Sequence, residues 1–128
     1  MRLVFDSNIV IKILNNDLEI ISIFNQFKEY SITSVSLGEL YFGAAKSIRA
    51  SENSKTIDLL AANSRILNAD VKSAKEYGII KSELKKRGNP VPENDLWIAA
   101  ICRANDCTLA TLDKHFLTMS DFIKLYEF

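Results

Sequence analysis

Four carboxylates in this sequence stand beside short apolar segments: Asp6, Glu39, Asp95 and Asp113. Like charges about 4 Å apart cost roughly 4 kcal/mol at an effective dielectric constant of about 20, so a cluster of these acids needs a cation. Mg²⁺ or Mn²⁺ fits best, because both take oxygen ligands and the chain has no cluster of histidine and cysteine for zinc or copper. A site of this kind activates water for the hydrolysis of a phosphodiester.

The elements that must position these carboxylates alternate between strand and helix. Apolar runs bounded by turn formers predict strands, and apolar residues at helical spacing, such as Ile20, Phe24 and Phe27, predict helices. The predicted strands cover Arg2–Phe5, Tyr30–Thr33, Arg65–Ala69, Cys107–Thr111 and Phe122–Phe128. One helix is predicted to begin near Asn8. The other predicted helices cover Asp17–Glu29, Ser34–Ser47 (with serine caps), Glu52–Ala62, Asp70–Arg87 and Asn94–Asn105. This alternation is typical of an α/β domain with a mostly parallel sheet flanked by helices.

In such a sheet, functional groups gather outside the carboxyl ends of the strands. Asp6 directly follows the first predicted strand, and Asp113 lies two residues beyond Thr111, where the fourth strand ends. Glu39 falls in the opening turns of the helix that leaves the second strand. Asp95 opens a helix that leads into a parallel strand, so this helix must start at the same edge. We therefore expect the four carboxylates to converge.

Each acid also has an ordinary structural explanation. Asp6 is a good cap for the helix that follows it, and Glu39 lies three residues after Ser36, which is capping-box spacing. Asp95 suits the positive end of a helix, and Asp113 suits a turn. Individually the four signals are weak, and their value lies in the shared edge of the sheet.

Composition limits the class of protein further. The 128 residues, 48% of them hydrophobic, fit one domain, which we expect to cover residues 1–128. Because 16 basic residues balance 16 acidic ones, any binding of nucleic acid must come from local patches or from metal. No apolar stretch approaches the about 20 residues of a membrane span and no leader opens the chain, so we expect a cytoplasmic protein with no membrane partner. Cys102 and Cys107 are expected to be reduced core residues.

Four motifs in this order resemble those of PIN-domain proteins, specifically the VapC-like toxin ribonucleases of toxin–antitoxin modules. The motifs are FDSNIVI, SVSLGELYFGA, GNPVPENDLWIAA and LATLDKHF, and together they cover nearly the whole chain. The resemblance implies a three-layer α/β/α PIN-like domain with a central, mostly parallel sheet of strand order 3-2-1-4-5. It also implies a catalytic, metal-binding cluster of Asp6, Glu39, Asp95 and Asp113. Asp6 and Asp95 would be direct Mg²⁺ ligands, and Asn8 and Thr111 would support them by hydrogen bonding.

The same resemblance implies an activity and its partners. We expect an endoribonuclease toxin that depends on Mg²⁺ or Mn²⁺, in which metal-activated water attacks the RNA phosphorus and leaves a 5′-phosphate and a 3′-hydroxyl. The implied partners are the RNA substrate, a second copy in a homodimer, and a VapB-like antitoxin whose C-terminal segment lies along the toxin groove. Apolar helix faces around Ile20–Phe27 or Leu37–Phe42 are candidates for such contacts.

Several alternatives stay open at this point. A PIN-domain nuclease of RNA processing, or a catalytically silent PIN-type binding module, would share the motifs. A phosphoacceptor signalling domain would have adjacent acids after its first strand, and a haloacid-dehalogenase-type phosphatase would have a second acid where this chain has Asn8.

The only histidine and the basic residues carry weaker signals. His115 is expected to pack beside Phe116 and not to act as a general base, so His115→Ala should keep activity. Two explanations stay open for the basic residues near the expected groove, namely binding of phosphate and simple solvation of a helix face; these residues are Lys12, Lys46, Arg49, Lys85, Lys86 and Arg87.

Overall fold

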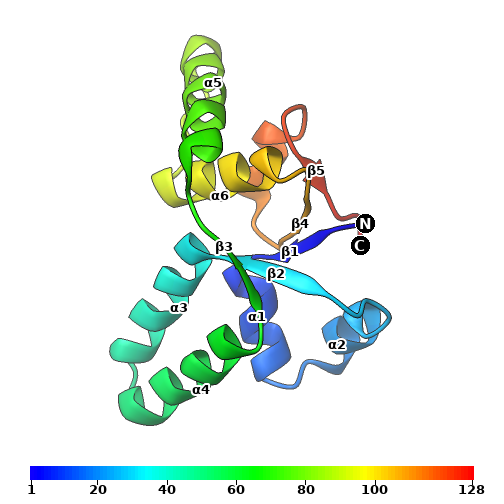
Figure 1. Ribbon diagram of the computed structural model, residues 1–128, viewed down its shortest axis with the longest axis vertical. Coiled ribbons are helices and arrows are strands. Elements are labelled where there is room, and N and C mark those ends of the chain that lie inside the picture. The colour runs from blue at the N-terminus through cyan, green and yellow to red at the C-terminus, as the bar shows by residue number, and fades with distance from the viewer.

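The computed structural model describes residues 1–128, and its elements form three layers (Figure 1). The central layer is a five-stranded sheet of β1 (Leu3–Phe5), β2 (Tyr30–Thr33), β3 (Arg65–Leu67), β4 (Thr108–Ala110) and β5 (Lys124–Leu125). The strand order is β3-β2-β1-β4-β5 and every neighbouring pair is parallel. This confirms the predicted α/β/α class and its strand order.

Helices cover both faces of the sheet. Below it in Figure 1 lie α1 (Ser7–Leu14), α2 (Leu18–Phe24), α3 (Ser34–Ala45) and α4 (Ala50–Ala62). Above it lie α5 (Val71–Arg87) and α6 (Glu93–Ala104), and the 3₁₀ helix η1 (Lys114–Met119) leads into β5. Because every connection between the parallel strands crosses over through helices, the carboxyl ends of the strands are all left at one edge.

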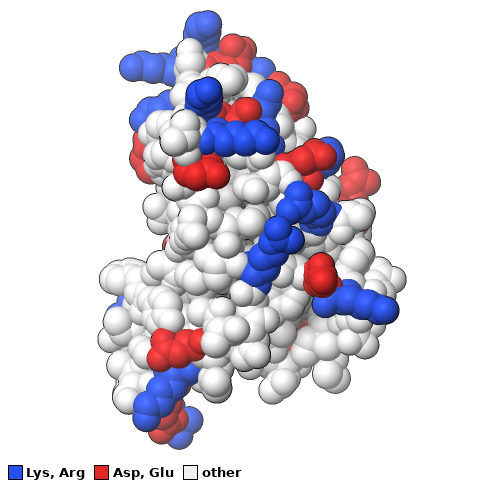
Figure 2. Space-filling view, in the orientation of Figure 1, with Lys and Arg blue, Asp and Glu red and all other residues white.

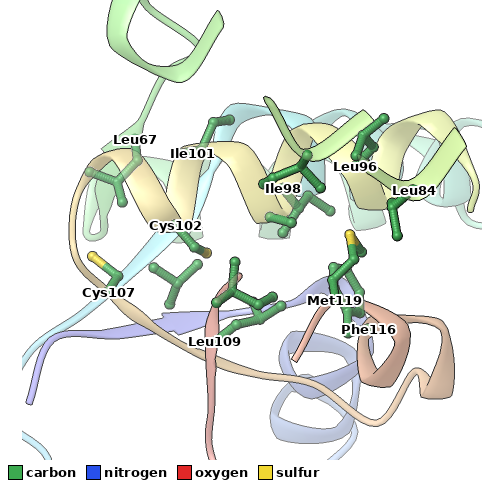
Figure 3. Packing of buried hydrophobic residues seen from close by; sticks show 14 residues of the cluster. Leu67, Leu84, Leu96, Ile98, Ile101, Cys102, Cys107, Leu109, Phe116 and Met119 are labelled. Carbon is green, nitrogen blue, oxygen red and sulfur yellow. The ribbon is translucent and has the colours of Figure 1, made fainter. Parts of the chain in front are cut away.

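Two apolar cores separate the layers. In the core above the sheet, α6 buries eight of its twelve residues, as a helix that is apolar nearly all round must. Figure 3 shows Ile98 and Cys102 of α6 pointing toward Leu109 of β4 and toward Phe116 and Met119 of η1. Cys102 and Cys107 are both buried and unpaired, as predicted. Since α6 is held so firmly, the residue at its start has little freedom to move.

The hairpin of α5 and α6 sets the start of α6 at the carboxyl edge of the sheet. Asp70 caps α5 by accepting a hydrogen bond from the Ser73 backbone N–H at 2.9 Å. Tyr77 of α5 stacks on Trp97 of α6 with ring centroids 4.1 Å apart. At the other end of α5, Gly88 adopts a left-handed conformation with φ of 69° and turns the chain back.

Several local predictions were wrong at their boundaries. The helix expected over Asp17–Glu29 ends at Phe24, and η1 was not predicted. Thr33, not a serine, caps α3, since its Oγ1 accepts a hydrogen bond from the Ser36 backbone N–H at 3.0 Å. Ser36 therefore lies inside the helix, which excludes the capping box with Glu39.

The surface carries both signs of charge. Lysine and arginine are interspersed with aspartate and glutamate on the face shown in Figure 2, most densely over α5. Arg87 is held by Glu83 at 3.1 Å and by Asp121 at 2.6 Å, and Lys12 lies 3.7 Å from Asp17. These pairs favour the solvated-face explanation for both basic residues. None of the helices combines the length and the apolar character that crossing a bilayer requires.

The two apolar helix faces named as candidate contact surfaces differ in how far the structure exposes them. Ile20 and Phe24 are 8% and 5% exposed and belong to the core below the sheet, so this face is not available to a partner. Phe42 on α3 is 66% exposed, with the Lys46 ammonium 4.8 Å from its ring centroid.

Two glycines of the α5 hairpin give a matched test of the fold. Gly88→Ala should destabilise the protein by about 1–2 kcal/mol, because a Cβ disfavours the left-handed conformation. Gly78→Ala, inside the same helix, should stabilise it by roughly 0.5–1 kcal/mol through helix propensity. At both positions a Cβ would meet nothing within 4 Å, so crowding does not enter. Urea unfolding of both variants measures the difference, and equal signs would contradict the assigned backbone conformations.

Candidate metal centre

Asp6 is fixed where β1 passes into α1. The parallel register sets Phe5 beside Ala110 of β4, and the Asp6 backbone N–H continues the ladder to the Ala110 carbonyl at 3.0 Å. The Asp6 side chain caps α1 by accepting a hydrogen bond from the Ser7 backbone N–H at 2.8 Å. The cap explanation for Asp6 is thus correct, and it holds together with a place in the acidic cluster.

A hydrogen-bond network joins Asp6 to the chain beyond β4. The Thr111 hydroxyl donates to Asp6 Oδ2 at 2.7 Å and accepts from the Asp113 backbone N–H at 3.0 Å. Asn8 donates through Nδ2 to the same Asp6 oxygen at 3.3 Å, while its Oδ1 accepts from the Leu112 backbone N–H at 3.1 Å. Asn8 and Thr111 therefore both donate hydrogen bonds to Asp6, and their role as supports of a metal ligand stays a prediction.

Asp95 and Asp113 meet at His115. Asp113 caps η1 by accepting a hydrogen bond from the His115 backbone N–H at 2.9 Å. The His115 ring turns back, so that its Nδ1 lies 3.0 Å from Asp113 Oδ1 and 3.4 Å from Asp95 Oδ2. The expectation that His115 simply packs was wrong, since its side chain is 59% exposed and only Phe116 beside it is buried.

Glu39 reaches the cluster from α3. Its Oε1 accepts a hydrogen bond from the Ser7 hydroxyl at 3.4 Å, and one turn earlier the buried Ser36 hydroxyl lies 3.5 Å from Asp6 Oδ1. Glu39 also lines a hollow of about 460 Å³ between α3 and the start of α6, opposite Asn94. The structure thus brings all four predicted carboxylates to one edge of the sheet. The contact of Ser36 with Asp6 and the position of Asn94 beside Glu39 were not predicted from the sequence, although Ser36 lies one helical turn before Glu39 and so shares its face.

The family model described as PIN domain matches residues 3–121. This chain belongs to the PIN domain family. The matched range includes each of the four carboxylates described above, and it extends from β1 to the end of η1.

Named proteins and solved structures similar to this PIN domain are known. The chain is 36% identical over 113 residues to Ribonuclease VapC2 of Haemophilus influenzae, covering 87% of this chain and 86% of that protein. It is 31% identical to the tRNA(fMet)-specific endonuclease VapC of Shigella flexneri over the same shares of the two chains. The structure of DNA-bound VapBC from Salmonella typhimurium superposes with a TM-score of 0.88 at 26% identity, covering 98% of this chain and 97% of that one. VapBC-1 from nontypeable Haemophilus influenzae gives a TM-score of 0.87 at 27% identity, with coverage of 99% and 98%.

Burial and nearby charges disfavour ionisation of three acids of this PIN domain, Asp6, Glu39 and Asp95. Burial, followed by the charges of Asp113 and Asp6, raises the pKa of Asp95 to about 7. Burial is also the largest cause of the raised pKa values of Asp6 and Glu39. Hydrogen bonds from Thr111 and Ser7 oppose this effect at Asp6, whereas Asp95 Oδ2 is buried and accepts no hydrogen bond. A buried carboxylate oxygen without a hydrogen-bond partner suits the binding of a cation.

The residues present suit a divalent ion. Asp95, Asp113 and His115 each offer one ligand atom, and these three atoms all lie within 4.8 Å of one another. The charges of Asp6 and Glu39 are close enough to raise the Asp95 pKa, so both also belong to this negative environment. A set dominated by carboxylate oxygens suits Mg²⁺ or Mn²⁺ better than zinc or copper.

The pKa of Asp95 predicts how the stability of the metal-free protein depends on pH. A carboxyl whose pKa rises from about 4 in the unfolded chain to about 7 in the fold binds more protons when folded, between those two pH values. Stability therefore falls as the pH rises through this window. We expect a lower Tm at about pH 8 than at about pH 5 in scanning calorimetry with chelator, and a flatter dependence in Asp95→Asn.

A matched control for this measurement is Asp106→Asn. Asp106 pairs with Lys124 at 2.7 Å on the surface and has a positive φ of 51°, which asparagine also tolerates. This variant removes one carboxylate without touching the cluster, so the pH dependence between about 5 and 8 should match that of the unaltered protein. An unchanged slope in Asp95→Asn would contradict the assignment of the effect to the cluster.

The Thr111 hydroxyl gives a second test of the cluster. Thr111→Val keeps the shape of the side chain but leaves Asp6 Oδ2 and the Asp113 backbone N–H short of a partner, which should cost about 1–3 kcal/mol in urea unfolding. Thr111→Ser keeps the hydroxyl and should lose clearly less. If the serine variant were as unstable as the valine variant, the methyl group and not the hydrogen bonds would be the stabilising part.

Proposed function

We propose that this protein is a divalent-metal-dependent endoribonuclease, the toxin of a type II toxin–antitoxin module that acts in the cytoplasm. The observation that carries the proposal is the convergence of four carboxylates, with one buried oxygen unpartnered, at the carboxyl edge of a PIN-domain sheet. RNA is the proposed substrate because similar proteins over most of this chain are named ribonucleases, and one is named as an endonuclease for tRNA(fMet).

The carboxylates divide into two roles. Asp6, Asp95 and Asp113, with Glu39 beside them, would hold Mg²⁺ or Mn²⁺, which lowers the pKa of a bound water and neutralises charge on the phosphate. Thr111 and Asn8 orient Asp6 through the hydrogen bonds to its Oδ2. Burial and then the Asp6 charge raise the pKa of Glu39 above its ordinary value. A carboxylate with a raised pKa accepts a proton more readily, which suits Glu39 to act as a general base.

A groove beside the acids suits an antitoxin segment. It has a volume of about 400 Å³ and is lined by side chains of α1, α3 and α4, among them Ile11, Leu14, Leu40 and Ile57, with Glu39 on its wall. An amphipathic segment could bury its apolar side chains there and pair a basic residue with Glu39. Similar solved structures are those of VapBC proteins, which supports an antitoxin of this kind. Assembly with a second copy of the chain is proposed from the family resemblance alone.

Removal of single acids tests the nuclease directly. Asp6→Asn and Asp95→Asn should each lower RNA cleavage by at least a hundredfold, because each removes a charged oxygen from the ion site. Circular dichroism should show that both variants keep the folded secondary structure. Chelator should abolish cleavage and added Mg²⁺ or Mn²⁺ should restore it.

The products and a control variant sharpen this test. Cleaved RNA should carry a 5′-phosphate and a 3′-hydroxyl, which ligation-based sequencing of the new ends detects. Asp106→Asn should cleave normally, since this residue is exposed and paired with Lys124 away from the cluster. A 2′,3′-cyclic phosphate, or full activity in chelator, would refute the mechanism.

A further inference from the structure

We infer that the Nδ1 atom of His115 binds the metal ion directly, together with Asp95 and Asp113, and that this nitrogen makes the site prefer Mn²⁺ over Mg²⁺. The inference rests on the proposed function, because it concerns the same ion site. It adds a nitrogen ligand to a cluster that otherwise supplies only carboxylate oxygens.

The spacing of the atoms carries the first part of the argument. Ligands on neighbouring corners of an octahedron lie about 3.0 Å apart when each bond to the metal is about 2.1 Å long. Nδ1 of His115 lies 3.0 Å from Asp113 Oδ1 and 3.4 Å from Asp95 Oδ2. Each of the three residues offers one ligand atom within 4.8 Å of the other two, so the three residues suit one shared ion.

Asp95 supplies an independent observation. Its side chain is 9% exposed, and its Oδ2, which faces His115, is buried without a hydrogen-bond partner. A buried carboxylate oxygen in that state is costly unless a cation binds it. A cation held by this oxygen would also be within reach of the imidazole nitrogen, which lies 3.4 Å from it.

The position of His115 is set by the structure around it, although its ring is exposed. The His115 backbone N–H donates to Asp113 at 2.9 Å, and its carbonyl accepts from the Thr118 hydroxyl at 2.8 Å. The next residue, Phe116, is fully buried in the core above the sheet. The backbone is therefore held at both ends of the turn, and the ring needs no large movement to present Nδ1 to an ion.

The chemistry of the ligands sets the preference between metals. Mg²⁺ binds oxygen ligands and rarely nitrogen, whereas imidazole suits ions of the first transition series. A site with two carboxylates and one imidazole should therefore gain affinity for Mn²⁺ relative to Mg²⁺. If His115 instead only donates a hydrogen bond to the acids, it competes with any ion, and its removal would strengthen the binding of both metals.

The experiment measures the binding of each metal without RNA. At about pH 8, calorimetric titrations with Mn²⁺ and with Mg²⁺ would be made on the unaltered protein, on His115→Ala and on the control Lys114→Ala. Lys114 is exposed in the same turn and is not one of the candidate ligands, so it controls for the loss of a side chain at this surface. Pulsed electron paramagnetic resonance of the Mn²⁺ form would report any ¹⁴N coupling to the ion.

The expected result is a ¹⁴N coupling in the unaltered protein and in Lys114→Ala that is lost in His115→Ala. Mn²⁺ affinity should fall about tenfold or more in His115→Ala, while Mg²⁺ affinity changes by less than about threefold. No ¹⁴N coupling in the unaltered protein, or an equal change in the affinity for both metals, would overturn the inference. Since His115 is exposed, a Tm in the presence of chelator close to that of the unaltered protein should show that the variant folds.

These outcomes are independent of the nuclease activity. RNA cleavage with Mg²⁺ by both the unaltered protein and His115→Ala, without any ¹⁴N coupling, would leave the proposed function standing and remove the role of His115. Conversely, a ¹⁴N-coupled Mn²⁺ site in a protein that cleaves no RNA would keep the ligand assignment and refute the nuclease.

Discussion

The parallel pairing of β1 with β4 is the constraint on which the site depends. These strands come from opposite ends of the chain, and their register sets Phe5 beside Ala110, so Asp6 and Thr111 emerge next to each other. Neighbouring strands lie about 4.8 Å apart, and the Thr111 hydroxyl closes this gap to 2.7 Å from the Asp6 carboxylate. The acidic cluster therefore forms only when the first and last thirds of the chain have folded together.

The same convergence makes the negative charges of the metal-free cluster repel one another. The fold stabilises the charge on Asp6 more than the charge on Asp95. Asp6 sits at the N-terminus of α1, where the helix dipole and hydrogen bonds from Ser7 and Thr111 stabilise its charge. Asp95 lies in the first turn of α6, but one of its oxygens accepts no hydrogen bond, and its pKa is raised to about 7. Protons and a divalent ion therefore compete for Asp95 near neutral pH, and metal binding must release protons.

Much of the fold follows from the sequence, with limits that have physical causes. β2 was predicted with its observed bounds, Tyr30–Thr33, because this short run lies between the polar residue Glu29 and the cap former Ser34. The strand order came from the family resemblance, since periodicity reports which face of a strand is buried but not its neighbours in the sheet. The second helix was predicted too long because Phe27 keeps helical spacing beyond the end of α2 and still packs on the core. The 3₁₀ helix η1 was not predicted, because its six residues are too few to show a helical pattern of apolar residues.

The carboxylates were predictable because the ends of parallel strands share an edge, whereas contacts that depend on the direction of a side chain were not. Asp113 precedes His115 by two residues, a spacing at which an aspartate can accept a hydrogen bond from the second following backbone N–H. That turn is a local signal available in the sequence. Once Phe116 is assigned to the core, the neighbouring ring must point outward, and the turn brings it back over Asp113 and Asp95. Thus the carboxylate that anchors the backbone of this turn also positions the only imidazole of the chain beside the acids.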